Sequence, residues 1–150
     1  MKPHLLPAGN GYHIQWNLDK SVGKGASNSS REDVTYIQWY YTLAAESPLI
    51  DRARAAIYAQ VRITGTCTGR DDDPLVKAII AHQTFLRHPV IDGRVSVAHG
   101  NGKVGSNAFF VFRLGARLAD MYPNEWPRLD KIKKCPDGVK KAVARCIPRI

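Results

Sequence analysis

Side chains that could act as nucleophiles, bases or metal ligands are few in this sequence and lie far apart. The five histidines form no HExxH pattern, and the three cysteines form no CxxC pair, so the sequence predicts no metal site. His82 lies in an otherwise apolar stretch, which favours a packed, hydrogen-bonded histidine over a catalytic one. Cys67 with a histidine as base is the remaining catalytic alternative, but no signature of a reactive cysteine surrounds it. We therefore expect no catalytic residue and no cofactor.

Cys135 and Cys146 bracket a short basic segment near the end of the chain. They are candidates for a disulfide, which would suit an oxidising compartment. The alternative is that all three cysteines are reduced, as is usual in a cytosolic protein.

Two other patterns of polar residues favour structural roles. Three adjacent aspartates precede Pro74, which is typical of a helix start and lacks the alternating spacing of a calcium loop. The glycine-rich segments at residues 23–25 and 100–103 are too short for a phosphate-binding loop.

Four aromatic residues follow one another closely at positions 36, 39, 40 and 41. On a helix they would cover more than one face, so some should be exposed, where they could stack on a sugar or a base. We expect Tyr41 to lie in the core, because it continues the apolar stripe of Val34 and Ile37.

Hydrophobic periodicity and capping residues predict a mainly helical chain with short β pieces. Residues 1–11 are expected to form an arm, and 12–18 a short strand. Ser29 and Glu32 suggest a capping box at the start of the first helix. Further helices are predicted at residues 51–60, from Asp73 to before Pro89, at 108–121 and at 139–145, with a β-prone segment at 61–67 and a turn at Asp92 and Gly93.

Charge is distributed unevenly along the chain. The formal net charge is +9, and residues 101–150 hold 11 Lys/Arg against 4 Asp/Glu, which leaves +7 in that third. A basic surface attracts polyanions such as nucleic acid, anionic lipid or an acidic cell envelope, although a merely solvated surface is the alternative. Nucleic acid is the weakest of these partners, because no nucleic-acid-binding motif is present.

No apolar run is long enough for a transmembrane helix, and the first residues do not form a secretory signal peptide. We therefore expect either a cytosolic protein or export by a route without a cleaved signal.

Four short segments occur in an order that forms two half-repeats. Residues 32–38 (EDVTYIQ) are followed by 63–67 (ITGTC), and residues 78–83 (AIIAHQ) are followed by 90–95 (VIDGRV). This order resembles the peptidoglycan-binding-like domain family, especially the versions found in type VI secretion effectors and phage-type lytic proteins. The resemblance covers about residues 21–105. The sequence departs from the family at His82, where the family has phenylalanine, and in the aromatic run after Gln38.

The resemblance implies a three-helix bundle at residues 21–105, preceded by an arm and strand at 1–20 and followed by a basic helical extension at 106–150. It implies non-catalytic binding to peptidoglycan in a secretion or lysis system, in the periplasm or outside the cell, after synthesis in the cytoplasm. The expected ligand-binding residues are Asp92, Gly93, Arg94, Asn101, Lys103, Tyr36 and Trp39. Two alternatives remain: an immunity, adaptor or chaperone-like protein that binds an effector, and a cell-wall-degrading enzyme.

Overall fold

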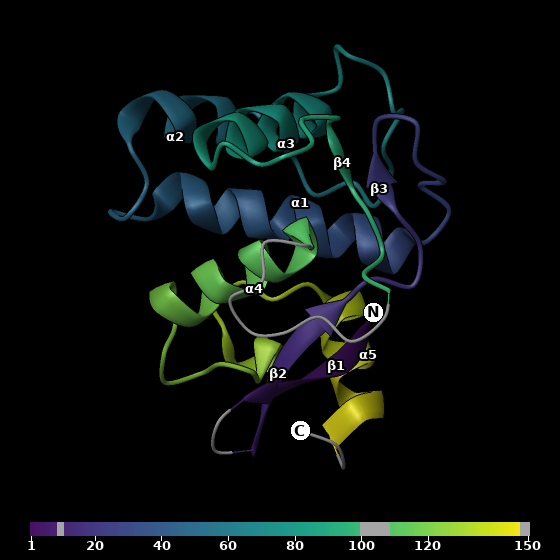
Figure 1. Ribbon diagram of the computed structural model, residues 1–150, viewed down its shortest axis with the longest axis vertical. Coiled ribbons are helices and arrows are strands. Elements are labelled where there is room, and N and C mark those ends of the chain that lie inside the picture. Colours follow the sequence, from purple (N-terminus) through teal and green to yellow (C-terminus); the bar gives the residue numbers. More distant parts are fainter. Residues whose placement is uncertain (9–10, 100–108, 148–150) are drawn as a thin grey trace.

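Helix α1 (Arg31–Glu46) runs through the middle of the molecule and separates two layers (Figure 1). The computed structural model describes residues 1–8, 11–99 and 109–147. On one side of α1 lie α2 (Arg52–Tyr58), α3 (Pro74–Phe85) and the paired strands β3 (Val22–Gly23) and β4 (Arg94–Val95). On the other side lie strands β1 (Lys2–Ala8) and β2 (Gly11–Asn17), helices α4 (Phe110–Met121) and α5 (Asp137–Cys146), and a 3-10 turn, Leu129–Lys131. The chain is thus mainly helical with two small antiparallel sheets, as expected.

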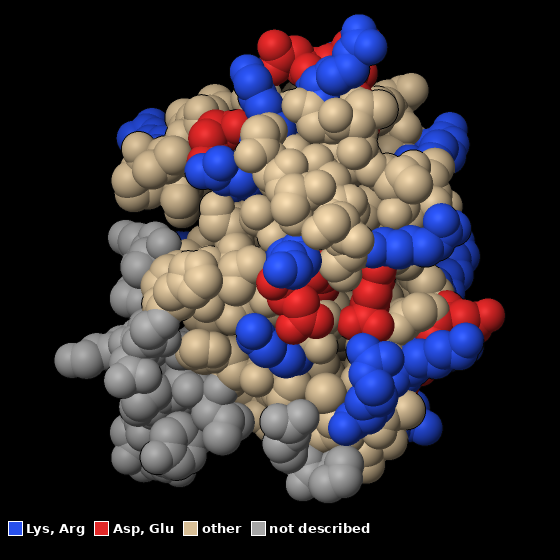
Figure 2. All heavy atoms as spheres, turned by 90° about the vertical axis from the view of Figure 1, so that its right-hand side faces the viewer, with Lys and Arg blue, Asp and Glu red and all other residues tan. Residues whose placement is uncertain are grey.

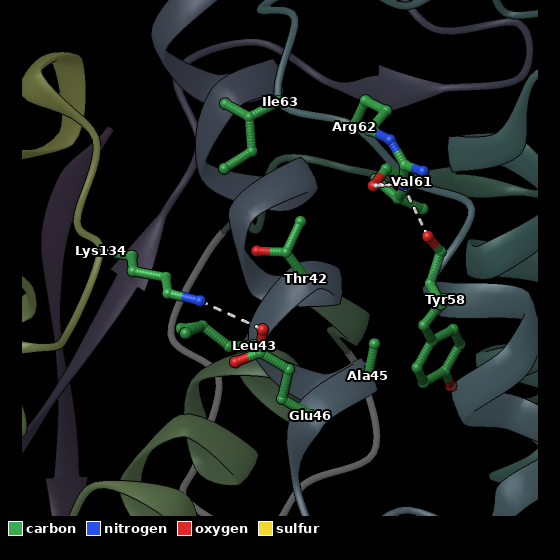
Figure 3. Close-up of a pocket in the computed structure, with 10 residues that line it drawn as sticks. Thr42, Leu43, Ala45, Glu46, Tyr58, Val61, Arg62, Ile63 and Lys134 are labelled. Atoms are coloured by element: carbon green, nitrogen blue, oxygen red, sulfur yellow. Dashed lines mark hydrogen bonds and ion pairs between the residues drawn. The ribbon is translucent and has the colours of Figure 1, made fainter.

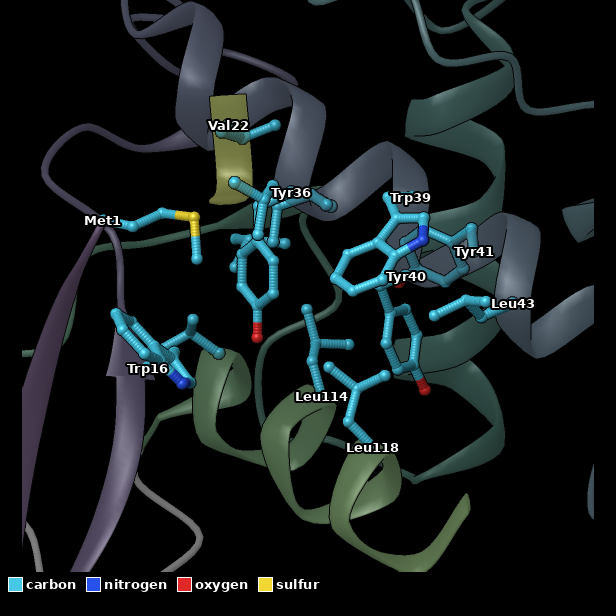
Figure 4. Close-up of a cluster of buried hydrophobic side chains, with 14 of the residues drawn as sticks. Met1, Trp16, Val22, Tyr36, Trp39, Tyr40, Tyr41, Leu43, Leu114 and Leu118 are labelled. Carbon is cyan, nitrogen blue, oxygen red and sulfur yellow. The ribbon is translucent and has the colours of Figure 1, made fainter. Parts of the chain in front are cut away.

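Helix α1 is buried around its circumference because both layers pack against it. Every residue from 33 to 41 is buried. Tyr36 and Tyr40 point from α1 toward α4, where Leu114 and Leu118 lie (Figure 4). The helix begins one residue later than predicted: its N-cap is Ser30, whose hydroxyl accepts from the Asp33 N–H at 3.1 Å.

The predicted N-terminal arm is a strand. Strand β1 pairs antiparallel with β2, and Lys2 lies opposite Asn17. Pro3 and Pro7 lie in this strand, although proline disfavours the middle of a sheet. Proline is tolerated in an edge strand, and both strands of a two-stranded sheet are edge strands. Helix α4 packs on β2, which ties the two ends of the chain together.

The carboxylate of Asp33 joins this hairpin to α1. Its Oδ2 accepts the backbone N–H groups of Asp19 and Lys20 at 2.9 and 2.8 Å, while Oδ1 lies 2.9 Å from the amino group of Met1. Asp19 and Glu32 contact the same amino group at 2.6 and 2.9 Å. Burial opposes the charge of this ammonium, but the hydrogen bonds that it donates to the three carboxylates outweigh burial and raise its pKa.

Each of α1 and α3 holds a glycine turn through one buried glutamine, and we call this arrangement a clasp. In the first clasp, Gln38 Oε1 accepts the N–H groups of Thr64 and Gly65, both at 2.9 Å. Gln38 Nε2 donates to the Thr66 carbonyl at 2.9 Å. One amide therefore satisfies three backbone groups of the turn.

The second clasp repeats this pattern on α3. Gln83 Oε1 accepts the N–H groups of Asp92 and Gly93 at 3.1 and 2.9 Å, and its Nε2 donates to the Arg94 carbonyl at 3.1 Å. The central glycines have φ of +76° at Gly65 and +71° at Gly93, values that other residues rarely adopt. The two half-repeats in the sequence thus form two equivalent contacts in space.

We predict that replacing either clasp glutamine by methionine, which keeps the side-chain length, destabilises the fold. The variants Gln38→Met and Gln83→Met each leave two backbone N–H groups and one carbonyl without the glutamine amide. The expected loss in the free energy of unfolding is about 2–4 kcal/mol, since each stranded buried polar group costs about 1–3 kcal/mol and turns relax in part. Urea denaturation measures this loss in the free energy of unfolding. The control variant Gln60→Met, at an exposed position, should change stability by less than about 0.5 kcal/mol. Equal stability of all three variants would contradict a structural role for the clasps.

Candidate functional site

A hollow of about 220 Å³ lies beside the second clasp. It is bounded by the end of α3, the turn at residues 92–94 and the start of α4. Its lining combines charged, polar and aromatic side chains: Gln83, His88, Val90, Asp92, Arg94, Ser96, Phe109 and Phe110. This is the candidate binding site, because the polar and charged side chains of residues 83–96 meet there with the two phenylalanines at the start of α4.

The turn that carries Arg94 is held from several directions. Asp92 Oδ1 accepts the Arg94 N–H at 3.0 Å and the Gln83 amide at 3.0 Å. Strand β4 pairs with β3, where Val22 faces Val95 and Gly23 faces Arg94. The backbone of the site is therefore fixed before a ligand arrives, which reduces the entropy lost on binding.

Arg94 supplies positive charge at the edge of the hollow. Its side chain is 39% exposed, and its Nη2 lies 3.5 Å from Asp92 Oδ2. Its Nε donates to the Ser96 hydroxyl at 3.2 Å. A guanidinium has five N–H donors, and these contacts engage only its Nε and one Nη, so it retains donors for an anionic ligand.

His88 also lines the hollow. Its Nδ1 lies 2.9 Å from the Val90 carbonyl, and its ring packs edge-on against Phe110 with centroids 5.5 Å apart. Its Nε2 is buried and has no hydrogen-bond partner within the described part of the chain. A buried polar atom in this state is a natural contact for a ligand or a water molecule.

The structure brings together three of the residues predicted to bind ligand and corrects two others. Asp92, Gly93 and Arg94 lie at the hollow. Tyr36 and Trp39 are fully buried, so they cannot stack on a ligand, because the β1–β2 hairpin and α4 cover the face of α1 that was expected to be exposed. Asn101 and Lys103 lie outside the described residues.

The predicted disulfide is also wrong. Cys135 and Cys146 are free and buried. Cys135 precedes the first turn of α5, whereas Cys146 ends that helix of 10 residues. Nine residue steps of an α-helix span about 14 Å, whereas the Cα atoms of a disulfide lie no more than about 7 Å apart.

The two residues considered for catalysis have environments that suit packing. His82 is buried among Tyr40, Tyr41 and Phe110, with its Nδ1 3.2 Å from the Tyr41 hydroxyl. Burial lowers its pKa to about 3, so the ring is neutral near pH 7. The expectation of a packed, hydrogen-bonded histidine is confirmed.

Cys67 is partly buried, and burial raises the pKa of its thiol to about 11. A thiol in this state is protonated at neutral pH, whereas a nucleophilic cysteine has to form the thiolate. The nearby Asp73 caps α3 by accepting the Leu75 N–H at 2.9 Å, as the run of aspartates predicted.

The sequence alone did not identify Gln83, His88, Ser96, Phe109 and Phe110 as site residues. One signal was available: a glutamine in each half-repeat precedes a glycine turn, which suggests an amide that bonds to that turn. Phe109 and Phe110 could not be assigned, because they reach the hollow only through the packing of α4.

Several of the described basic residues of the C-terminal third pair with acidic residues instead of forming one continuous positive surface. Lys133 and Lys134 each lie 3.2 Å from Glu46, Arg145 lies 2.8 Å from Glu32, and Arg128 pairs with Asp130. Figure 2 shows Lys and Arg beside Asp and Glu across one face of the molecule.

Comparisons with protein-family models, with curated proteins and with solved structures found no match. None of the described helices is both apolar enough and long enough to span a lipid bilayer.

We predict that His82 makes the fold sensitive to acid. Between pH 6.5 and about 3 the unfolded chain binds a proton at this residue and the folded chain does not, so stability falls as the pH falls. The free energy of unfolding of the unmodified chain should therefore drop by about 2 kcal/mol more than that of His82→Gln between pH 7 and pH 5. Denaturant titration at both pH values measures this difference. His99→Gln, at an exposed histidine, should retain the dependence, and a parallel loss in His82→Gln would refute the prediction.

Proposed function

We propose that the chain is a non-catalytic binding module for bacterial peptidoglycan, acting in a secretion or lysis system. The observation that carries this proposal is the pair of clasps. Four motifs that resemble the peptidoglycan-binding-like family form two matching glutamine–glycine contacts, on α1 and on α3. In this proposal α1, α2 and α3 are the three helices of the family's bundle. The β1–β2 hairpin, α4 and α5 then form an additional layer.

The hollow at the second clasp is the proposed ligand site. Its volume of about 220 Å³ suits one residue-sized group rather than a long stretch of glycan. Peptide stems of the cell wall carry carboxylates, which Arg94 can bind through its remaining N–H groups. His88 Nε2 can contact the adjacent amide or amine of the stem, while Asp92 holds the turn in shape.

The formal net charge of +9 supports the same proposal at longer range. An anionic envelope attracts a cationic protein and raises its local concentration, and salt weakens this attraction. Binding should therefore have a salt-dependent part from the whole surface and a more specific part from the hollow.

One observation favours a second candidate, an adaptor or immunity protein that binds an effector. Three apolar side chains near the hollow are more than half exposed: Phe85 at 52%, Val90 at 54% and Ile91 at 52%. Neighbouring exposed apolar residues are typical of a protein interface.

The proposed function predicts that the protein is retained by insoluble peptidoglycan at about 0.15 M salt, and that Arg94→Gln weakens retention about tenfold or more. The loss of one charge-assisted hydrogen bond accounts for an effect of this size. The bound fraction in a pull-down, measured against the amount of peptidoglycan, gives the apparent affinity.

Arg70→Gln is the matched control for this experiment. Like Arg94, Arg70 lies 3.5 Å from an aspartate two residues away, but it does not line the hollow. The Arg70→Gln variant should bind peptidoglycan as the unmodified chain does. If the unmodified chain is not retained, peptidoglycan binding is excluded. If instead an effector co-purifies with the unmodified chain and this co-purification is lost when Val90 and Ile91 are replaced by serine, the second candidate is favoured.

A further inference from the structure

The first clasp has a hollow of its own, for which the proposed function assigns no role. We propose that this hollow is a docking site for an acidic peptide segment of a partner protein, with one apolar side chain inserted between α1 and the segment at residues 61–63. Its volume is about 460 Å³, and it lies between α1, the end of α2 and Lys134 (Figure 3). The inference follows from the placement, lining and charge of this hollow.

Two lining positions of this hollow correspond, within the repeat, to lining positions of the hollow at the second clasp. Leu43 follows the first clasp glutamine by five residues and His88 follows the second by five, and each lines its own hollow. Arg62 precedes the first clasp glycine by three residues, and Val90 precedes the second by three. The two hollows thus share two positions of the repeat, whereas clasp residues line only the second hollow.

The lining of the first hollow suits an apolar side chain. Ile63, which is 43% exposed, and the half-buried Ala45 contribute its exposed apolar surface, while Leu43 and Val61 lie beneath it at 1% and 2% exposed. In Figure 3 the side chain of Thr42 lies between Ile63 and Glu46, and Lys134 extends from the opposite side toward Glu46. An apolar residue that entered here would remove this surface from water, worth about 25 cal/mol per Å² of apolar area.

The charges at the rim of the hollow favour acidic residues on either side of the inserted apolar residue of the peptide. Glu46 is the one carboxylate among the described residues that line the hollow, and Lys133 and Lys134 share it at 3.2 Å each. The Nη1 of Arg62 donates to the Ala59 and Val61 carbonyls at 2.7 and 3.2 Å, contacts that do not neutralise its charge. Arg62 and Lys134 line the hollow and Lys133 lies beside it on Glu46, so the cations outnumber the one anion, and glutamate or aspartate in the peptide would balance the excess.

The test uses a fluorescein-labelled peptide with one leucine flanked on both sides by glutamates, and fluorescence anisotropy as the readout. A second peptide has glutamine in place of glutamate, and a third has alanine in place of leucine. We expect the first peptide to bind, and each of the others to bind at least about tenfold more weakly, since both the charge and the apolar anchor contribute.

Two variants locate the site. Lys134→Glu reverses the charge at the edge through a side chain that is 70% exposed, so the fold should be unaffected. Ala45→Phe fills the hollow. Both should weaken binding of the leucine–glutamate peptide about tenfold or more, whereas Lys140→Glu and Ala144→Phe, at exposed positions on α5, should not.

The inference is overturned if the unmodified chain does not bind the first peptide, if the glutamine peptide binds equally well, or if Lys134→Glu binds as the unmodified chain does. A dimer in light scattering that Ala45→Phe dissociates would assign the hollow to a second copy of the chain and would also overturn it. Retention on peptidoglycan is measured separately, and Lys134→Glu should change it no more than Lys140→Glu, which alters the net charge equally, so failure of one proposal is distinguishable from failure of the other.

Discussion

The burial of α1 on all sides is the constraint on which the rest of the structure depends. A helix with layers on both faces cannot direct its polar groups to water, so each is stabilised only by a partner inside the protein. The Tyr36 and Tyr40 hydroxyls and Trp39 Nε1 have none among the described residues, whereas three other side chains do. Gln38 bonds to the turn at residues 64–66, Asp33 bonds to the chain that leaves β2, and Tyr41 bonds to His82 on α3. These contacts reach three different segments. Polar residues that would destabilise a core helix if they lacked partners therefore help to determine how the chain folds around α1.

The parts of the fold that depend on local chemistry were predictable, and those that depend on distant segments were not. The Asp73 cap, the stop near Pro89 and the turn at Gly93 follow from one or two residues and their neighbours. Whether Tyr36 and Trp39 are exposed or buried cannot be predicted from their neighbours in the sequence, because it depends on whether residues before 20 and after 109 return to cover α1. A helix with aromatics on several faces indicates a second layer, and this signal favours burial over ligand stacking.

The two clasps preserve one contact across very different connections. The first glutamine bonds to a glycine 27 residues ahead, and the second to a glycine 10 residues ahead. The longer connection contains α2, whose Tyr58 packs against Tyr41 with ring centroids 4.8 Å apart. Since the entropic cost of closing a loop grows only slowly with its length, an insertion of this size is compatible with the same closing contact. The clasp fixes the direction in which each chain segment leaves its turn, while the residues beside it are free to differ.

That freedom gives the two hollows different physical characters. At the second clasp, His88 Nε2 and Arg94 offer directional hydrogen bonds within a small space, so affinity there should depend on the exact shape of a ligand. At the first clasp, exposed cations surround an apolar surface, and their attraction acts over about a Debye length, roughly 8 Å at physiological salt. Recognition there should tolerate variation in sequence as long as negative charge and one apolar residue are kept. Salt should therefore weaken binding at the first hollow much more than at the second. This difference in salt dependence would distinguish the two proposed modes of binding.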